Sequence, residues 1–167
     1  MNVCGYIPES INEGPGLRAV LFVSGCRHAC AGCFNTDSWD FEAGEPFTEE
    51  MSSAILQDIL DNPLLDGVTL CGGDPFFSPD ECVAFVRKLR TFCPSKNVWA
   101  YTGFTFEALM RQPKLRELAL LCDVIVDGKF ELERRDVSLP FRGSSNQRFI
   151  DVAASMEQGL AVEYILR

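Results

Sequence analysis

Short apolar runs alternate with amphipathic segments along this chain, and that alternation limits the folds it can adopt. Four runs predict buried strands, at residues 17–23, 67–71, 98–101 and 123–126. Three segments between them have apolar side chains at helical spacing, at residues 48–62, 79–92 and 106–121. Strands that alternate with helices form right-handed βαβ units, so the pattern predicts a parallel sheet.

Residues near the helix ends support these boundaries. Thr48 is expected to cap the first helix through its hydroxyl group. Pro79 stands near the start of the second helix, where a missing N–H costs nothing. Pro113 is expected to interrupt the third helix.

Chain length limits the size of the sheet. Weaker strand signals at 147–152 and 161–165 flank a short helical segment. A full eight-fold (β/α) barrel takes about 250 residues, and this chain has 167. We therefore predict an α/β fold, a partial, open (β/α) barrel with parallel strands, in a single domain over residues 1–167.

The overall charge and the N-terminal sequence argue against several classes of protein. The formal net charge of −9 is unlike a broad phosphate-binding surface, so we expect no nucleic-acid partner. The chain has no run of about 18 apolar residues, so we expect no membrane-spanning helix. Residues 1–10 lack the pattern of a secretory signal. We therefore expect a cytoplasmic protein with no membrane partner, whose eight cysteines are reduced.

Three of the cysteines lie within eight residues, directly after the first predicted strand. Cys26, Cys30 and Cys33 follow the pattern C-x3-C-x2-C, and a loop this short can wrap its thiolates around one centre. Iron–sulfur cubanes usually take four thiolates. Three would leave one iron open, and an open position distinguishes a reactive metal site from a closed structural one.

Two other interpretations of these cysteines stay open at this point. His28, the single histidine, could complete a zinc site, although one residue between Cys26 and His28 is cramped spacing for a tetrahedral ion. A disulfide plus an odd cysteine fits poorly with a reducing compartment. The other five cysteines are expected to be buried apolar residues: Cys4, Cys71, Cys82, Cys93 and Cys122.

The cysteine pattern after the first strand resembles the radical S-adenosylmethionine superfamily. Residues 12–18 (NEGPGLR) are similar to the N-terminal signature of glycyl-radical activating enzymes. Further segments resemble one branch, the activating proteins of anaerobic, class III ribonucleotide reductases. These segments are residues 33–35 (CFN), 72–75 (GGDP), 101–104 (YTGF), 126–130 (VDGKF) and 142–148 (RGSSNQR).

The resemblance implies an activating enzyme whose cofactors are a 4Fe-4S cluster and S-adenosylmethionine. In that branch the reduced cluster passes one electron to the sulfonium, and the resulting 5′-deoxyadenosyl radical takes a hydrogen from a backbone glycine of the reductase. The implied partners are anaerobic ribonucleoside-triphosphate reductase and an electron donor of the flavodoxin or ferredoxin type. Activation of another glycyl-radical enzyme is a close alternative. A non-catalytic zinc module or an electron carrier is the alternative from another class.

Matched by position, the cluster ligands are Cys26, Cys30 and Cys33. The residues matched to S-adenosylmethionine contacts are Gly32, Cys33, Phe34, Gly72, Gly73 and Asp74. Gly72 and Gly73 follow a predicted parallel strand, at the end where such sheets bind ligands. Asp74 could accept a hydrogen bond from the ammonium group of the methionine part.

Two positions depart from the wider superfamily. Many members have an aromatic residue where Gly32 stands, and here the aromatic residue is Phe34. Many have glutamate where Asp74 stands. Both differences are usual for the branch, and they weaken the transfer of adenine contacts from distant relatives.

Three further segments have more than one interpretation. Residues 14–19 fit G-x-G-x-x-A but precede a strand, so a dinucleotide site is not expected. Asp127 and Lys129 could line the site or form an ordinary surface pair. Residues 142–148 could be a solvated loop or a contact with S-adenosylmethionine or the reductase.

Overall fold

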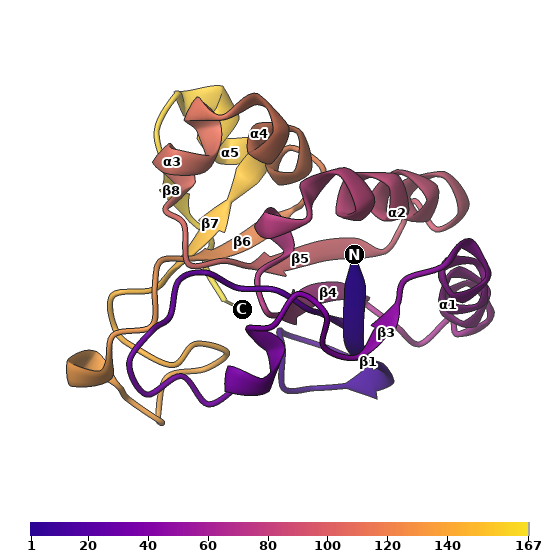
Figure 1. Cartoon of the computed structure of the whole chain (residues 1–167). Coiled ribbons are helices and arrows are strands. Elements are labelled where there is room, and N and C mark those ends of the chain that lie inside the picture. Colours follow the sequence, from indigo (N-terminus) through magenta and orange to yellow (C-terminus); the bar gives the residue numbers. More distant parts are fainter. Residues whose placement is uncertain (167) are drawn as a thin grey trace.

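The computed structural model describes residues 1–166, which form one eight-stranded sheet with five α-helices (Figure 1). The strands are β1 (Asn2–Ser10), β2 (Arg18–Val23), β3 (Glu45–Pro46), β4 (Gly67–Gly72), β5 (Asn97–Tyr101), β6 (Val124–Asp127), β7 (Arg148–Asp151) and β8 (Val162–Glu163). The helices are α1 (Glu49–Asp61), α2 (Pro79–Phe92), α3 (Phe106–Arg111), α4 (Pro113–Ala119) and α5 (Val152–Gln158). Short 3-10 turns are η1 (Thr36–Ser38), η2 (Pro75–Phe77) and η3 (Leu132–Arg134).

The centre of the sheet is parallel, as the alternation predicts. The strand order is β3-β1-β2-β4-β5-β6-β7-β8, and β2, β4, β5 and β6 pair in parallel. The predicted α/β fold is therefore confirmed. Both edges are antiparallel, with β1 and β3 on one side and β7 and β8 on the other. Curvature of this sheet into a partial barrel stays a prediction.

The helix ends lie close to where the sequence puts them. The Thr48 hydroxyl accepts a hydrogen bond from the Met51 backbone N–H at 3.2 Å, so the predicted cap is confirmed. Pro79 is the first residue of α2, and Pro113 is the first residue of α4, which separates that helix from α3. Within residues 1–166, no helix combines the length and the apolar character needed to cross a membrane.

The N-terminal strand was not predicted. β1 alternates irregularly between exposed and buried residues, so its sequence has no clear period. The prediction that Cys4 is buried is wrong, because it lies on the exposed side of this strand, 3.1 Å from the Ser24 hydroxyl. Cys71, Cys82, Cys93 and Cys122 are buried as predicted, and burial raises the pKa of each thiol.

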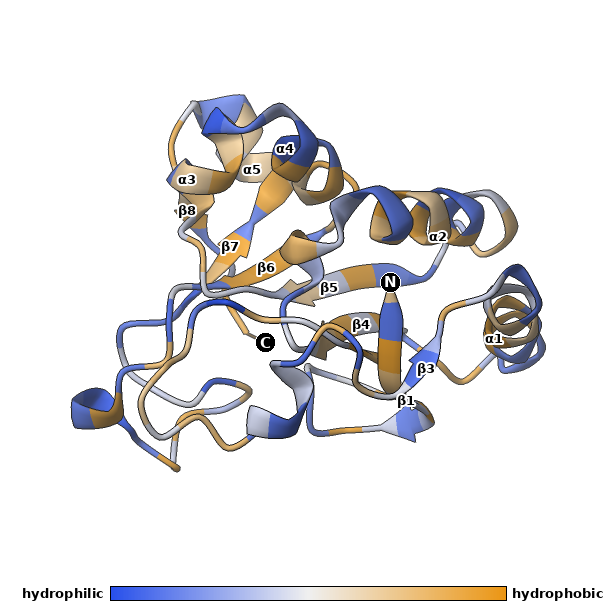
Figure 2. Cartoon of the chain, in the orientation of Figure 1, coloured by the Kyte–Doolittle hydropathy of each residue, from blue (hydrophilic) through white to orange (hydrophobic). Residues whose placement is uncertain are grey.

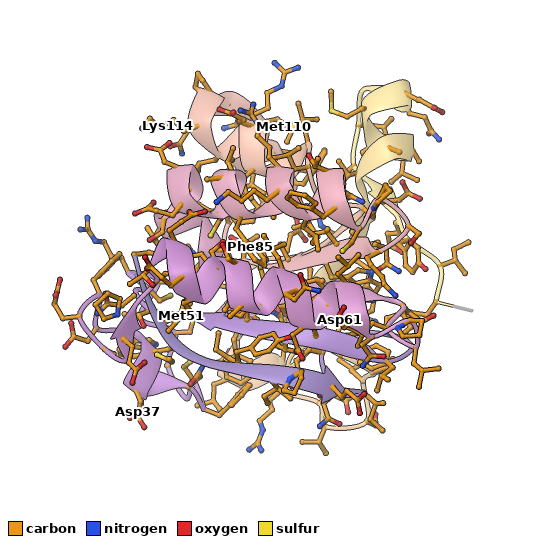
Figure 3. The ribbon with its side chains drawn as sticks, turned by 90° about the vertical axis from the view of Figure 1, so that its right-hand side faces the viewer. Asp37, Met51, Asp61, Phe85, Met110 and Lys114 are labelled. Carbon is orange, nitrogen blue, oxygen red and sulfur yellow. The ribbon has the colours of Figure 1, made fainter. Side chains whose placement is uncertain are left out.

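Helices α1 to α4 cover one face of the sheet. Strand residues that point to this face, such as Leu70 and Ile125, are fully buried against them. Figure 2 shows hydrophobic strands inside and hydrophilic outer surfaces on the helices. Phe85 lies between α1 and α2 (Figure 3), and its ring meets Phe47 edge-on at 5.6 Å. Each such side chain contributes about 1.5–3 kcal/mol by leaving water.

The opposite face of the sheet is covered by loops, and it has a different composition. Trp99 and Phe149 form a small aromatic cluster there. Arg18 is fully buried on this face, where its Nε donates to the Thr69 hydroxyl at 2.7 Å and its guanidinium lies over the Trp99 ring. Burial lowers the pKa of Arg18 to about 10. The loops after β2 and after β6 lie side by side at the left of Figure 1, beside this face.

Candidate functional site

The cysteine loop begins where β2 ends, and backbone hydrogen bonds fix its first residues. Gly25 N donates to Ser38 O at 2.8 Å, and Cys26 N donates to Trp39 O at 3.1 Å. On the other side, Asp74 N donates to Gly25 O at 3.0 Å. The turn at η1 and the end of β4 therefore hold the start of the loop between them.

The three loop cysteines are free thiols of intermediate exposure, and all of them line one cavity of about 120 Å³. Gly72, Gly73 and Asp74 line the same cavity, so the structure brings together these two sets of predicted site residues. Burial raises the pKa of the Cys26 thiol to about 11. Without a cation this group is a neutral thiol, and a bound metal ion would replace its proton.

The donors in this cavity fit an iron–sulfur cluster better than a zinc ion. A zinc site needs four donors around one ion. His28, the fourth donor of that alternative, instead has its Nε2 atom 2.7 Å from Asp74 Oδ2. Three thiolates on one loop suit a cluster, in which each can bind a different iron.

Gly72 and Gly73 allow the end of β4 to lie against the cysteine loop. A Cβ atom at Gly72, where φ is +101°, would lie 2.6 Å from Val23 O. A Cβ atom at Gly73 would lie 2.5 Å from Gly25 O. These contacts are with backbone that cannot move aside, so glycine is required here for the packing of the loop itself.

The carboxylate of Asp74 is buried, and both of its oxygens accept hydrogen bonds within the protein. Its Oδ2 atom accepts from the Thr102 hydroxyl at 2.8 Å and from Gly103 N at 2.9 Å, beside the contact with His28. Its Oδ1 atom accepts from Phe76 N at 2.9 Å. Both oxygens therefore have partners within the protein, and Oδ1, which accepts a single hydrogen bond, keeps one acceptor position.

A second cavity of about 490 Å³ adjoins the first on the loop-covered face. Six residues line both cavities: Cys33, Gly72, Gly73, Tyr101, Phe130 and Gln147. Phe34 lines the larger cavity and is 94% exposed. The volume lies in the range of pockets that hold a small organic ligand, about 300–1,000 Å³.

Gly32 is the predicted site residue that borders neither cavity. It is exposed, has a φ of +74°, and lies under Leu132, which a Cβ atom would approach to 2.8 Å. Its conformation turns the chain between Cys30 and Cys33, where Cys33 N donates to Cys30 O at 3.1 Å. A glycine suits that left-handed position, whichever ligand lies nearby.

Some lining residues were not predicted as site residues. Tyr101, Phe130 and Gln147 belong to segments that carried the family resemblance, so a signal for them was present in the sequence. Trp39 also lines the smaller cavity, and no motif pointed to it. It arrives there because η1 folds back on the cysteine loop.

Asp127 and Lys129 do not form the surface pair that was one alternative. Asp127 is buried, and Arg148 binds it through Nε at 3.0 Å and Nη2 at 2.5 Å. The same carboxylate accepts from Phe106 N at 2.7 Å, at the start of α3. Lys129 is exposed. Asp127 therefore joins β6, β7 and α3.

Residues 142–147 are a braced turn rather than a freely solvated loop. The side-chain oxygen of Gln147 accepts from Gly143 N at 2.9 Å and Ser144 N at 3.2 Å. Asn146 Nδ2 donates to Lys129 O at 2.8 Å. The turn thus holds the segment after β6, which carries Phe130, over the two cavities.

Comparison with known protein families defines the class of protein to which this chain belongs. Residues 12–150 match the family model described as a 4Fe-4S single cluster domain. This range contains the cysteine loop, both cavities and the braced turn.

Individual relatives define the family more narrowly. A protein of Pasteurella multocida is 45% identical over 150 residues, which are 88% of this chain and 95% of the relative. A protein of Escherichia coli K12 is 40% identical over 150 residues, 88% of this chain and 96% of the relative. A protein of enterobacteria phage T4 is 37% identical over 150 residues, 89% of this chain and 92% of the relative. All three are named anaerobic ribonucleoside-triphosphate reductase-activating protein, and this chain belongs to that family.

Proposed function

We propose that this chain is a radical S-adenosylmethionine enzyme that generates a glycyl radical on anaerobic ribonucleoside-triphosphate reductase. One observation carries the proposal. Three free cysteines of one short loop line a cavity at the carboxyl ends of parallel strands, and a ligand-sized cavity adjoins it. The names of the relatives support the choice of the reductase as the partner.

Cys26, Cys30 and Cys33 would hold a 4Fe-4S cluster and leave its fourth iron without a protein ligand. When bound, the cluster supplies one electron to the sulfonium of S-adenosylmethionine, so that the C5′–S bond breaks into methionine and a 5′-deoxyadenosyl radical. The chain's own contribution is to hold its three cysteines on one loop, along the edge of one cavity.

S-adenosylmethionine would occupy the larger cavity, with its methionine part toward Cys33, Gly72 and Gly73. Phe34 would also line this cavity, while Gly32 would act through the turn of the loop. Asp74 is assigned to the support of this segment, because its oxygens already accept four hydrogen bonds. The backbone of Gly72 and Gly73 is then the part of the segment that can meet the ligand.

The substrate is a protein, so the radical must reach a glycine of the reductase. Transfer of one hydrogen atom from that glycine converts the radical into 5′-deoxyadenosine and leaves the glycyl radical behind. A flavodoxin or ferredoxin would supply the electron, in the cytoplasm. A partial barrel formed by the sheet would enclose the ligand on the loop-covered face.

The test is electron paramagnetic resonance of the anaerobically reconstituted, reduced protein, before and after S-adenosylmethionine is added. We expect a cubane signal that changes on addition, together with release of 5′-deoxyadenosine. Adding the reductase should then produce a glycyl radical signal in that partner. Colourless protein that binds zinc, or a cluster signal indifferent to S-adenosylmethionine, would contradict the radical mechanism and favour a zinc module or an electron carrier.

A further inference from the structure

We infer that His28 is a positioning residue, which fixes the cysteine loop to the ends of β4 and β5 and so keeps the three thiols facing one cavity before any cluster binds. The inference rests on the proposed role of these cysteines as cluster ligands. It assigns a purpose to the single histidine of the chain, which lies between two of them in the sequence.

His28 lines the smaller cavity, and the rest of its side chain packs against the protein. Its side chain is only 7% exposed. The ring packs against Phe77, with centroids 5.1 Å apart, and against Phe104 at 4.6 Å. A Cβ atom at Gly103 would lie 2.4 Å from the ring, so glycine leaves the space that the imidazole fills. A loop residue packed this closely defines the path of the backbone that carries it.

The polar end of His28 is fixed as well as its ring. Nε2 lies 2.7 Å from Asp74 Oδ2, and the other donors to that oxygen come from Thr102 and Gly103 at the end of β5. Because this carboxylate oxygen accepts, Nε2 carries the proton in the contact. The hydrogen bond joins the cysteine loop to a group that two strands already hold in place.

Backbone bonds alone leave part of the loop without such support. They fix Gly25 and Cys26 at its start, and Cys30 with Cys33 at its end. Between these anchors, Arg27 and Ala29 are exposed, and Ala29 has a φ of +49°. The Arg27 guanidinium lies over the Phe41 ring, but the Arg27 residue is exposed, whereas the His28 side chain is buried. Groups that orient metal ligands typically change metal retention by about 10–100-fold when removed.

The test measures how fast a chelator removes iron from the reconstituted, anaerobic full-length protein, so it does not depend on catalysis. His28→Phe keeps an aromatic ring in the slot and removes the donor, and Thr102 and Gly103 still satisfy Asp74 Oδ2. Gly103→Ala leaves the histidine in the sequence but pushes its ring out of the slot. His28→Gln keeps an N–H donor. Ala31→Ser, at an exposed position of the same loop, is the matched control.

We expect iron loss about tenfold faster in His28→Phe and in Gly103→Ala. His28→Gln should recover most of the retention, and Ala31→Ser should match the wild type. The inference is wrong if His28→Phe retains iron as the wild type does, or if His28→Gln loses iron as fast as His28→Phe. A wild-type protein that takes up no cluster would overturn the proposed function, and this inference with it, whereas a stable wild-type cluster with unaffected variants overturns the inference alone.

Discussion

The two faces of the sheet differ in what covers them and in what their residues do. The face under α1 to α4 is built from apolar side chains such as Leu70 and Ile125, packed without exposure. The face under the loops carries Arg18, Thr69 and Tyr101, and it adjoins the larger cavity. Alternate residues of the same strands supply both faces. The comparison indicates that one side of each strand stabilises the fold and the other side builds the site.

The largest expected effect separates the loop cysteines from a cysteine of the helix-covered face. Cys26→Ala, Cys30→Ala and Cys33→Ala should each abolish cluster binding and 5′-deoxyadenosine formation. Cys82→Ala should keep both, because Cys82 is buried in α2, on the helix-covered side of the sheet. Loss of its side chain should cost on the order of 1 kcal/mol of stability. Iron content and product release measure the difference. Loss of the cluster from folded Cys82→Ala would contradict this distinction between Cys82 and the loop cysteines.

A substitution in the helix-covered face should lower the stability of the protein and leave its iron binding unchanged. Leu70→Ala removes a fully buried side chain of β4 and should lower the free energy of unfolding by about 2–5 kcal/mol. Iron bound per folded molecule should not change, since Leu70 points away from both cavities. Urea unfolding of the metal-free protein gives the first quantity, and iron analysis of the soluble fraction gives the second. An unchanged unfolding midpoint would contradict this account of the core.

Arg18 tests whether the loop-covered face also contributes to stability. Arg18→Met should cost about 1–3 kcal/mol, because Val68 O and the Thr69 hydroxyl each lose a buried donor. The cost should shrink in the background of Thr69→Val, which removes one of these acceptors. A double-mutant cycle by urea unfolding measures that coupling. Strictly additive effects would mean that the hydrogen bond contributes little.

The smallest expected effect concerns the ion pair of Arg148 with Glu107, at the start of α3. The hydrogen bond from Arg148 lowers the pKa of Glu107 below its ordinary value of 4.5. A lowered folded-state pKa stabilises the protein above about pH 4.5, and this contribution is lost as the pH falls through the folded-state pKa. Glu107 is half-exposed, so Glu107→Gln should cost less than about 1 kcal/mol at pH 7.

The pH dependence of the stability difference between wild type and Glu107→Gln is the sharper measurement. Wild type and Glu107→Gln should differ most at neutral pH, and their unfolding free energies should converge below pH 4.5 as Glu107 takes up a proton. A difference that stays constant down to pH 3 would show that the carboxylate charge is not its cause. Asp127→Asn should lower the free energy of unfolding by more than Glu107→Gln does, because the buried carboxylate of Asp127 binds both Arg148 and the N-terminus of α3.

The sequence by itself determined the central strands, the helices and the cluster of cysteines. Continuous apolar runs and helical spacing are local signals, and caps such as Thr48 and breaks such as Pro113 mark the helix ends within a few residues. The loop C-x3-C-x2-C is equally local, so the sequence alone predicts that its three thiols act together. The antiparallel strands β1 and β3 were missed because exposed edge strands need no regular apolar pattern.

Only the tertiary structure decided which distant side chains meet at the site. Asp74, predicted to meet a ligand, lines the smaller cavity and also accepts hydrogen bonds from His28, Thr102 and Gly103, and no sequence spacing encodes contacts across 28 to 46 residues. The ring of His28, a candidate zinc ligand by sequence, packs against Phe77 and Phe104. The register of neighbouring parallel strands sets these contacts, because it brings the ends of β2, β4 and β5 to one edge of the sheet.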